Sequence, residues 1–353
     1  MSKENPPIVV AIPGDLHLTK ADLPNHRDAL HVVEEINSLI RPDFVQFIGD
    51  NVQDATEEQF QLFNDLRNRL ESPHYALVGD HDVDRQTGIE KFQSHLGETF
   101  GATRLKGYRF LRLNTREGKP VGFSEQQIDW LRAQLEDAKN QNEHVAIFQH
   151  NYPYQIWEDY AGPGIDDWRI LLQTHRVEGI ISGHTHYLQT ANDGRNAVFT
   201  VRSIGDPEAG RAGYAVAFFD GDDMAITYRT VDETGPLVMI THPRASLLAT
   251  VPKHIVSGPD KIRVRVWSSR KIVSVTRWID EKEPKQLFTT DEIDWVGSFD
   301  LIGLAKGEHL LEVEALWEDG TKYRGTIDFF ADPTGRYTPV PRVRPLVGGT
   351  AFC

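Results

Sequence analysis

Aspartate and histidine residues recur directly after five short apolar runs of this sequence, in patterns that suit metal binding. The blocks read Asp-Leu-His, Gly-Asp, Gly-Asp-His-Asp, a lone His, and Gly-His-Thr-His. Carboxylate oxygens and imidazole nitrogens bind borderline to hard cations such as Mn, Fe, Zn and Co. The candidate residues are Asp15, His17, Asp50, Asp80, His81, Asp82, His150, His184 and His186.

These residues offer more ligands than one ion can coordinate, but their number suits two ions that share a carboxylate. Two metals roughly 3.5–4 Å apart can clamp a phosphate and hold a hydroxide between them. The only cysteine is Cys353, which excludes a cysteine-based zinc site and an internal disulfide. The sequence therefore predicts a centre for phosphate-ester chemistry that is built from Asp and His and holds two divalent or mixed-valence ions.

The apolar runs before these blocks must position them. They are largely continuous, which is typical of strands buried on both faces, and sites in open α/β sheets form at the carboxyl ends of strands. Between the runs, Thr56 with Gln59 and Ser124 with Gln127 form helix-capping signatures. We therefore expect a layered α/β domain. Its expected strands cover residues 8–12, 44–48, 75–78, 145–148 and 177–181.

After about Thr230 the pattern changes to strand-like stretches separated by turn signals. This favours a small antiparallel, immunoglobulin-like β-sandwich with strands near 262–267, 272–279, 309–317 and 321–330. The predicted division is a catalytic domain over 1–235, a β-sandwich domain over 236–331, and an extended tail rich in Pro, Arg and Gly over 332–353.

The amino-acid composition and the net charge limit the classes of molecule that the protein is expected to bind. The 353 residues include 39% hydrophobic and 25% charged residues, and no apolar run approaches the roughly 20 residues of a membrane span. The net charge is −14 for the whole chain and −15 for residues 1–239, which disfavours binding of long nucleic acid unless bound cations reverse the sign locally. The polar N-terminus lacks a signal pattern, and one thiol fits a reducing cytoplasm. We expect a cytoplasmic protein that acts on a small phosphate ester and binds neither membrane nor long nucleic acid; a homo-oligomer is compatible with the sequence.

The ordered blocks at 15–17, 49–50, 79–82, 150 and 183–186 resemble those of the calcineurin-like metallophosphoesterase superfamily, over roughly residues 8–231. The segment 122–135 is also similar to the class III cyclic nucleotide phosphodiesterase branch. The resemblance implies a four-layer sandwich, in which helices flank two mixed β-sheets. With the C-terminal β domain added, the expected fold class is α/β (α+β).

The resemblance also implies a role for each residue of the blocks. His81 would assist the leaving group with a proton or hydrogen bond, and Asp82 would orient His81. The implied metal ligands are Asp15, His17 and His186 for the first metal, Asp80, His150 and His184 for the second, and Asp50 as the bridge between them.

The third block departs from the family pattern, which usually has asparagine where this chain has Asp80. An additional carboxylate should strengthen cation binding, and it should lower the Lewis acidity that the substrate phosphate experiences.

We predict a dinuclear metal-dependent phosphohydrolase, most readily a phosphodiesterase of small diesters such as cyclic nucleotides. A metal-bridging hydroxide would attack phosphorus while His81 assists the leaving group. Two alternatives stay open: a phosphomonoesterase, and a metal-bound interaction scaffold with weak catalysis.

Two further groups of side chains have both a functional and a structural interpretation. The aromatic residues after the fourth block could stack on a planar part of the substrate, or could pin their own loop. Three arginines could reach a substrate anion, or could be ordinary surface charges. These residues are Tyr152, Tyr154, Trp157 and Tyr160, and Arg195, Arg202 and Arg211.

Overall fold

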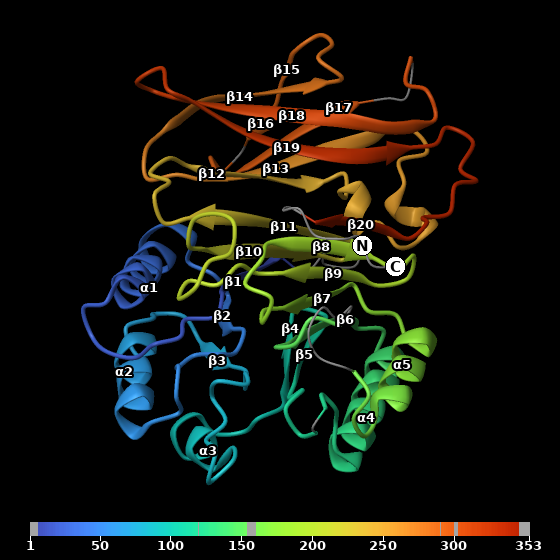
Figure 1. The fold of residues 1–353 in the computed structure, drawn as a ribbon. Helices are drawn as coiled ribbons and strands as arrows, with labels where there is room; N and C mark the ends of the chain where they lie inside the picture. The colour runs from blue at the N-terminus through green and yellow to red at the C-terminus, as the bar shows by residue number, and fades with distance from the viewer. Residues whose placement is uncertain (1–5, 119, 154–159, 290, 300–302, 346–353) are drawn as a thin grey trace.

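The computed structural model describes residues 6–118, 120–153, 160–289, 291–299 and 303–345. Two mixed β-sheets flanked by helices form the larger part of the molecule, and two antiparallel sheets lie against it (Figure 1). None of the described helices is long and apolar enough to cross a membrane.

The first mixed sheet has the strand order β11-β10-β1-β2-β3. Its strands are β1 (Ile8–Pro13), β2 (Phe44–Phe47), β3 (His74–Ala76), β10 (Gly213–Asp220) and β11 (Asp223–Thr230). The helices on its side are α1 (Pro24–Glu35), which continues into the π-helical turn η1 (Ile36–Ile40), α2 (Glu57–Arg67) and α3 (Glu90–Leu96).

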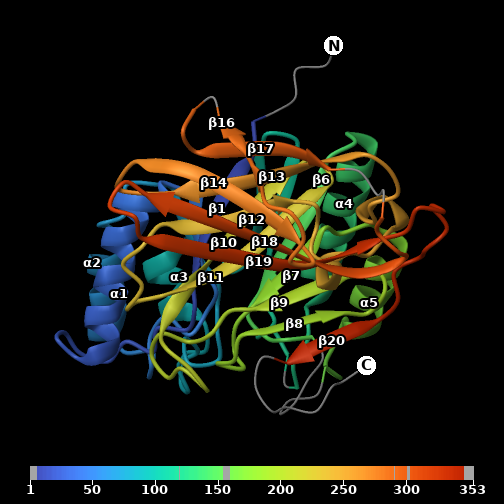
Figure 2. The same ribbon diagram turned by 90° about the horizontal axis from the view of Figure 1, so that it is seen from above.

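The second mixed sheet has the order β20-β8-β9-β7-β6-β5-β4. Its strands are β4 (Gly101–Leu105), β5 (Tyr108–Leu113), β6 (His144–Gln149), β7 (Gly179–Ser182), β8 (Gln189–Asn192), β9 (Ala197–Thr200) and β20 (Arg342–Pro345). The helices on its side are α4 (Glu125–Asn140) and α5 (Ile165–Thr174). Figure 2 shows α1 and α2 on one side of the molecule and α4 and α5 on the opposite side.

Alternate residues of the central strands belong to different hydrophobic cores, which explains their continuous apolar runs. In β1, Val9 faces the core shared with α1 and α2, whereas Val10 faces the core between the two mixed sheets. In β6, Phe148 faces the core between the sheets, and Ile147 faces α4 and α5. The four-layer sandwich expected from the sequence is therefore confirmed.

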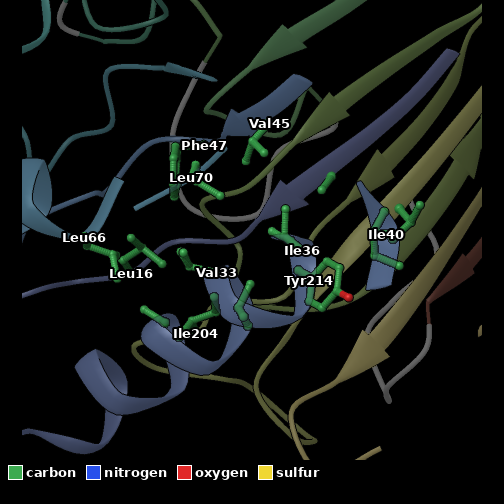
Figure 3. Close-up of a cluster of buried hydrophobic side chains, with 14 of the residues drawn as sticks. Leu16, Val33, Ile36, Ile40, Val45, Phe47, Leu66, Leu70, Ile204 and Tyr214 are labelled. Carbon is green, nitrogen blue, oxygen red and sulfur yellow. The ribbon is translucent and has the colours of Figure 1, made fainter. Parts of the chain in front are cut away.

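The core beneath α1 also anchors the loops that follow the strands. Figure 3 shows Leu16 and Ile204 in this core together with Val33 and Phe47. Leu16 is buried between Asp15 and His17 in the sequence, and the Ile204 amide donates to the Asp15 carbonyl at 2.9 Å. Packing of these apolar side chains thus fixes the backbone that carries two of the predicted ligands.

The antiparallel sheets have the orders β12-β13-β17-β16 and β15-β14-β18-β19, and enclose a core of their own. Their strands are β12 (Leu237–His242), β13 (Asp260–Trp267), β14 (Ile272–Ile279), β15 (Lys285–Gln286), β16 (Phe288–Thr289), β17 (Asp294–Phe299), β18 (Gly307–Trp317) and β19 (Lys322–Ala331). Two short 3-10 helices precede β13: η2 (Ser246–Leu248) and η3 (Pro252–His254). The predicted C-terminal β-rich fold is present.

Strand β12 joins the two parts of the molecule. Its residues Leu237 and Met239 belong to the core with α1, while Val238 and Ile240 belong to the core of the antiparallel sheets. Part of the predicted tail also returns to the larger part, because β20 pairs antiparallel with β8. The exact domain boundaries stay a prediction.

Candidate metal centre

The predicted site residues lie in the loops after β1, β2, β3 and β7 and directly after β6. Strands β1, β2 and β3 are parallel neighbours, and so are β6 and β7. Their carboxyl ends therefore meet at one edge of each sheet. The first predicted residue after each strand is Asp15, Asp50, Asp80, His150 and His184 in turn.

Four of the predicted ligands have a left-handed backbone conformation. The φ angles are 47° at His17, 50° at Asp50, 69° at His184 and 60° at His186. Residues with a Cβ rarely adopt this conformation, and it persists where the surrounding structure holds it in place. None of these four left-handed conformations was predicted from the sequence.

Two glycines permit the close approach of the ligand loops. A Cβ on Gly49 would lie 2.3 Å from Nδ1 of His150, and one on Gly79 would lie 2.1 Å from Oδ1 of Asp50. Both distances are too short for non-bonded atoms, so any larger residue would push a predicted ligand away. Gly49 has a φ of 101°, which adds a second requirement for glycine.

One group of donor atoms gathers around Asp80. Nδ1 of His184 lies 3.0 Å from Oδ1 of Asp80, and Nε2 of His150 lies 3.1 Å from the same oxygen. Nε2 of His150 is also 3.4 Å from Oδ2 of Asp50. These four side chains are close enough to share one cation.

A second group contains His17, His81 and again Asp50. Oδ1 of Asp50 accepts a hydrogen bond from the His81 amide at 2.9 Å. Its other oxygen, Oδ2, lies 3.8 Å from Nε2 of His17 and faces His150 on the other side. Asp50 is therefore the side chain common to both donor groups, which is the geometry a bridging ligand requires.

The two remaining predicted ligands adjoin these groups. Nε2 of His186 lies 3.0 Å from Nε2 of His17. Oδ1 of Asp15 lies 3.5 Å from Nδ1 of His150, and the Asp15 carboxylate accepts from the His184 amide at 3.2 Å. The structure thus brings all seven predicted ligands together.

The surroundings of His150 favour a positive charge within this donor set. Its Nδ1 lies 2.9 Å from the Ile48 carbonyl, which can only accept, so Nδ1 carries the proton. Neutral His150 would then point the lone pair of Nε2 at carboxylate oxygens of Asp50 and Asp80. A proton or a metal ion must lie between them. Burial opposes a charged imidazole here, but the two carboxylates outweigh it and raise the pKa of His150 well above its ordinary value.

Asp82 is fully buried and binds backbone rather than a side chain of the centre. Its carboxylate accepts from the amides of Asn51, Val52 and Gly79 at 3.0, 3.2 and 2.9 Å. Burial raises the pKa of Asp82 to about 7, with a contribution from the charge of Asp50. Asp82 therefore ties the loop after β3 to the loop after β2, and its predicted support of His81 would act through this backbone.

Gln53, which the sequence did not single out, contacts two histidines of the site. Its Oε1 lies 3.0 Å from Nδ1 of His17, and its Nε2 lies 3.1 Å from Nδ1 of His81. The Gln53 carbonyl also lies 2.9 Å from Nδ1 of His81. Burial disfavours the charged form of His81, but the Asp50 carboxylate and this carbonyl outweigh it, and the pKa of His81 is raised. A single glutamine between two loop histidines gives no recognisable sequence signal.

The aromatic segment after His150 is partly described. Tyr154 and Trp157 lie outside the described residues. Tyr152 and Tyr160 are buried in the core with α4 and α5. The Tyr160 hydroxyl donates to the Asn151 carbonyl at 2.7 Å, which favours a structural role for Tyr160.

The three arginines have protein partners. Arg195 donates to the Leu172 carbonyl at 2.8 Å, Arg202 donates to backbone carbonyls near residue 210, and Arg211 pairs with Asp232 at 3.3 Å. In the described structure, these arginines serve as structural or surface charges.

Comparison with known proteins identifies a family and several relatives with similar sequences. The sequence model of the family described as calcineurin-like phosphoesterase matches residues 8–188. A probable glycerophosphodiester phosphodiesterase of Arcobacter nitrofigilis is 26% identical over 203 residues, which cover 54% of this chain and 73% of the relative. A probable cyclic nucleotide phosphodiesterase of Colwellia psychrerythraea is 24% identical over 40% of this chain and 55% of its own length. The mouse tartrate-resistant acid phosphatase type 5 is 25% identical over 55% of this chain and 69% of the relative.

Proposed function

Because the chain belongs to the calcineurin-like phosphoesterase family, we propose that it is a dinuclear metal-dependent phosphodiesterase of small phosphodiesters. The observation that carries this proposal is the pair of donor groups that share Asp50. The phosphodiesterase names of two relatives support a diester substrate.

Each donor group would hold one cation. His17, with the adjoining His186 and Asp15, would serve the first metal, and Asp80, His150 and His184 would serve the second; Asp50 would be shared by both. Carboxylates and imidazoles suit Mn, Fe, Zn or Co. Bound together, two such cations supply a hydroxide nucleophile and neutralise charge on the phosphate.

The side chains of the protein would orient the ester and provide a proton. His81 is only partly buried and lies 4.0 Å from Asp80, so it can face a substrate at the second donor group. If Nδ1 of His81 donates to the Gln53 carbonyl, Nε2 is directed toward the substrate. A protonated His81 would then donate from Nε2 to the departing ester oxygen.

A phosphomonoesterase is the second candidate, and a specific observation favours it: one relative is named an acid phosphatase. A metal-bound scaffold with weak catalysis is a weaker alternative, because a scaffold gives no reason for His81, a histidine at the donor groups that is surplus to the predicted metal ligands. Cyclic nucleotides are one class of diester to test, since the Colwellia relative carries that name. We place the protein in the cytoplasm, where a single cysteine is compatible with the reducing environment.

The test compares bis(4-nitrophenyl) phosphate with 4-nitrophenyl phosphate, in the presence of manganese. A diesterase should show a higher kcat/KM on the diester. A higher kcat/KM on the monoester would favour the phosphatase. No turnover of either ester, with metal bound, would favour the scaffold.

A further inference from the structure

A cavity of about 640 Å³ lies beside the candidate metal centre, with Asp80 in its wall. Its volume is in the range of small-molecule sites, roughly 300–1,000 Å³. Since Oδ1 of Asp80 is 3.1 Å from His150, a phosphate held at the second donor group would have this cavity next to it. The cavity is therefore placed to receive one arm of a phosphodiester.

Two arginines line this cavity, in a part of the chain whose net charge is strongly negative. They are Arg85, after β3, and Arg116, after β5. Arg85 is exposed, and among the described residues it has no carboxylate within ion-pair distance. Its guanidinium is thus available to an anion from solution.

Besides Asp80, which belongs to the second donor group, the cavity wall has two acids, and both are directed to other partners. Oδ2 of Asp84 lies 2.7 Å from Nζ of Lys91. Oε2 of Glu117 accepts from the Ser124 amide at 2.8 Å and from the side chain of Gln127. Because these carboxylates are already neutralised or hydrogen-bonded, they do not compete strongly for Arg85.

Arg85 projects from a closed loop. The amide of Asp84 donates to the Gly88 carbonyl at 2.8 Å, and the Gly88 amide donates back at 2.9 Å. Oδ1 of Asp84 accepts from the amides of Gln86 and Thr87 at 2.8 Å each. These hydrogen bonds fix the backbone of Arg85 before any ligand binds. Binding then costs less conformational entropy, because the ligand does not have to order the loop.

We propose that this cavity binds an anionic group, a carboxylate or a phosphate, on one arm of the phosphodiester, and that Arg85 recognises it. The proposal rests on the proposed phosphodiesterase function and narrows its substrate class. A guanidinium forms charge-assisted, often paired hydrogen bonds with either anion.

The test uses diesters that share one leaving group. They are 4-nitrophenyl carboxymethyl phosphate and its neutral carbamoylmethyl isostere. The wild type should favour the carboxylate roughly tenfold in kcat/KM, as one charge-assisted contact allows. Arg85→Gln should raise KM for the carboxylate roughly tenfold, with kcat and the neutral substrate little changed. A 2-phosphoethyl arm, compared in the same way, distinguishes phosphate from carboxylate as the preferred group.

The matched control is Arg132→Gln, which removes an exposed arginine of α4 whose guanidinium is 3.4 Å from Asp167. It should keep the substrate preference. Equal KM values of the wild type for all arms, or an unchanged preference in Arg85→Gln, would overturn the proposal.

A binding measurement separates this proposal from the proposed function. Calorimetry on the manganese-loaded protein would compare carboxymethyl phosphate with carbamoylmethyl phosphate. Tighter binding of the carboxylate that is lost in Arg85→Gln supports the anion site even if no diester is hydrolysed. Turnover of diesters with equal binding of both ligands would contradict the anion site and leave the phosphodiesterase intact.

Discussion

Gln53 contacts His81 from both its backbone and its side chain: the carbonyl oxygen lies 2.9 Å from Nδ1, and the amide nitrogen lies 3.1 Å from the same atom. Nδ1 can donate to the carbonyl or accept from the side-chain amide, and either hydrogen bond holds the ring of the site histidine that is surplus to the predicted metal ligands. Nδ1 of the ring is therefore held by the protein, while Nε2 lies 4.0 Å from Oδ2 of Asp80, beside the second donor group.

Replacing His81 by alanine should reduce turnover while both metals stay bound. If His81 protonates the leaving group, kcat should fall on the order of 10²–10⁴-fold for an alkyl ester. The loss should shrink for 4-nitrophenolate, which leaves without a proton. Steady-state kinetics on esters of graded leaving-group pKa would check this, and an equal loss across the series would argue against proton donation.

Gln53→Leu should have a smaller effect, because the backbone carbonyl still holds His81. We expect roughly a tenfold lower kcat, larger for poor leaving groups than for good ones, with metal content preserved. Gln61→Leu, an exposed glutamine of the same region, is the matched control. A purely structural role for Gln53 would lower kcat equally for every leaving group.

Asp80→Asn restores the residue that the family usually has and removes one anionic ligand. Metal affinity should fall, because a neutral oxygen replaces a charged one, while the Lewis acidity of the bound ion should rise. Turnover of one phosphodiester should therefore be higher than wild type at saturating manganese and lower at limiting manganese. If turnover by the variant is equal to or lower than turnover by the wild type at every manganese concentration, the prediction is wrong. Asp80 would then be a metal ligand that suits catalysis in this protein better than asparagine.

The junction of the two parts of the molecule should lose stability at alkaline pH. His242 lies 3.0 Å from Oδ1 of Asp223 and has an ion-pair contact of 3.1 Å with Asp260, while Arg263 also pairs with Asp223. Burial opposes its charge, but the two aspartates outweigh burial and raise the pKa of His242 to about 9. A pKa raised by folding stabilises the protein fully below the ordinary value near 6.5, and this contribution disappears as pH rises through 9.

The expected loss between pH 6 and pH 9.5 is on the order of 1–3 kcal/mol in the free energy of unfolding. Urea unfolding at the two pH values would measure it. His242→Gln should remove most of this pH dependence, whereas His31→Gln, at an exposed position, should retain it. An identical pH dependence in wild type and His242→Gln would contradict the assignment.

The sequence predicted the layers and the gathering of ligands because both depend on local patterns. Continuous apolar runs mark strands buried on both faces, and Asp15 and His184 follow such runs directly. The helix starts at Thr56 and Ser124 were also correct, since each side chain accepts from the amide three residues later.

Other features depend on contacts between distant segments, which a pattern does not reveal. Strand β5 was not predicted, because Arg109 and Arg112 interrupt its apolar run. Arg109 is buried all the same, since its guanidinium pairs with Asp137 and Glu143. The same limit applies to Gln53, whose importance arises only when the loops after β1, β2 and β3 meet.

The most direct test of the dinuclear centre is the metal content of the purified, manganese-loaded protein, measured by elemental mass spectrometry for wild type and Asp50→Ala. Circular dichroism would confirm that the variant is folded, and Asp65→Ala, at an exposed position of α2, serves as the control. We predict two ions per chain for the wild type and the control, and at most one for Asp50→Ala, with its phosphodiesterase activity abolished. Two ions and full activity in Asp50→Ala would contradict a centre bridged by Asp50.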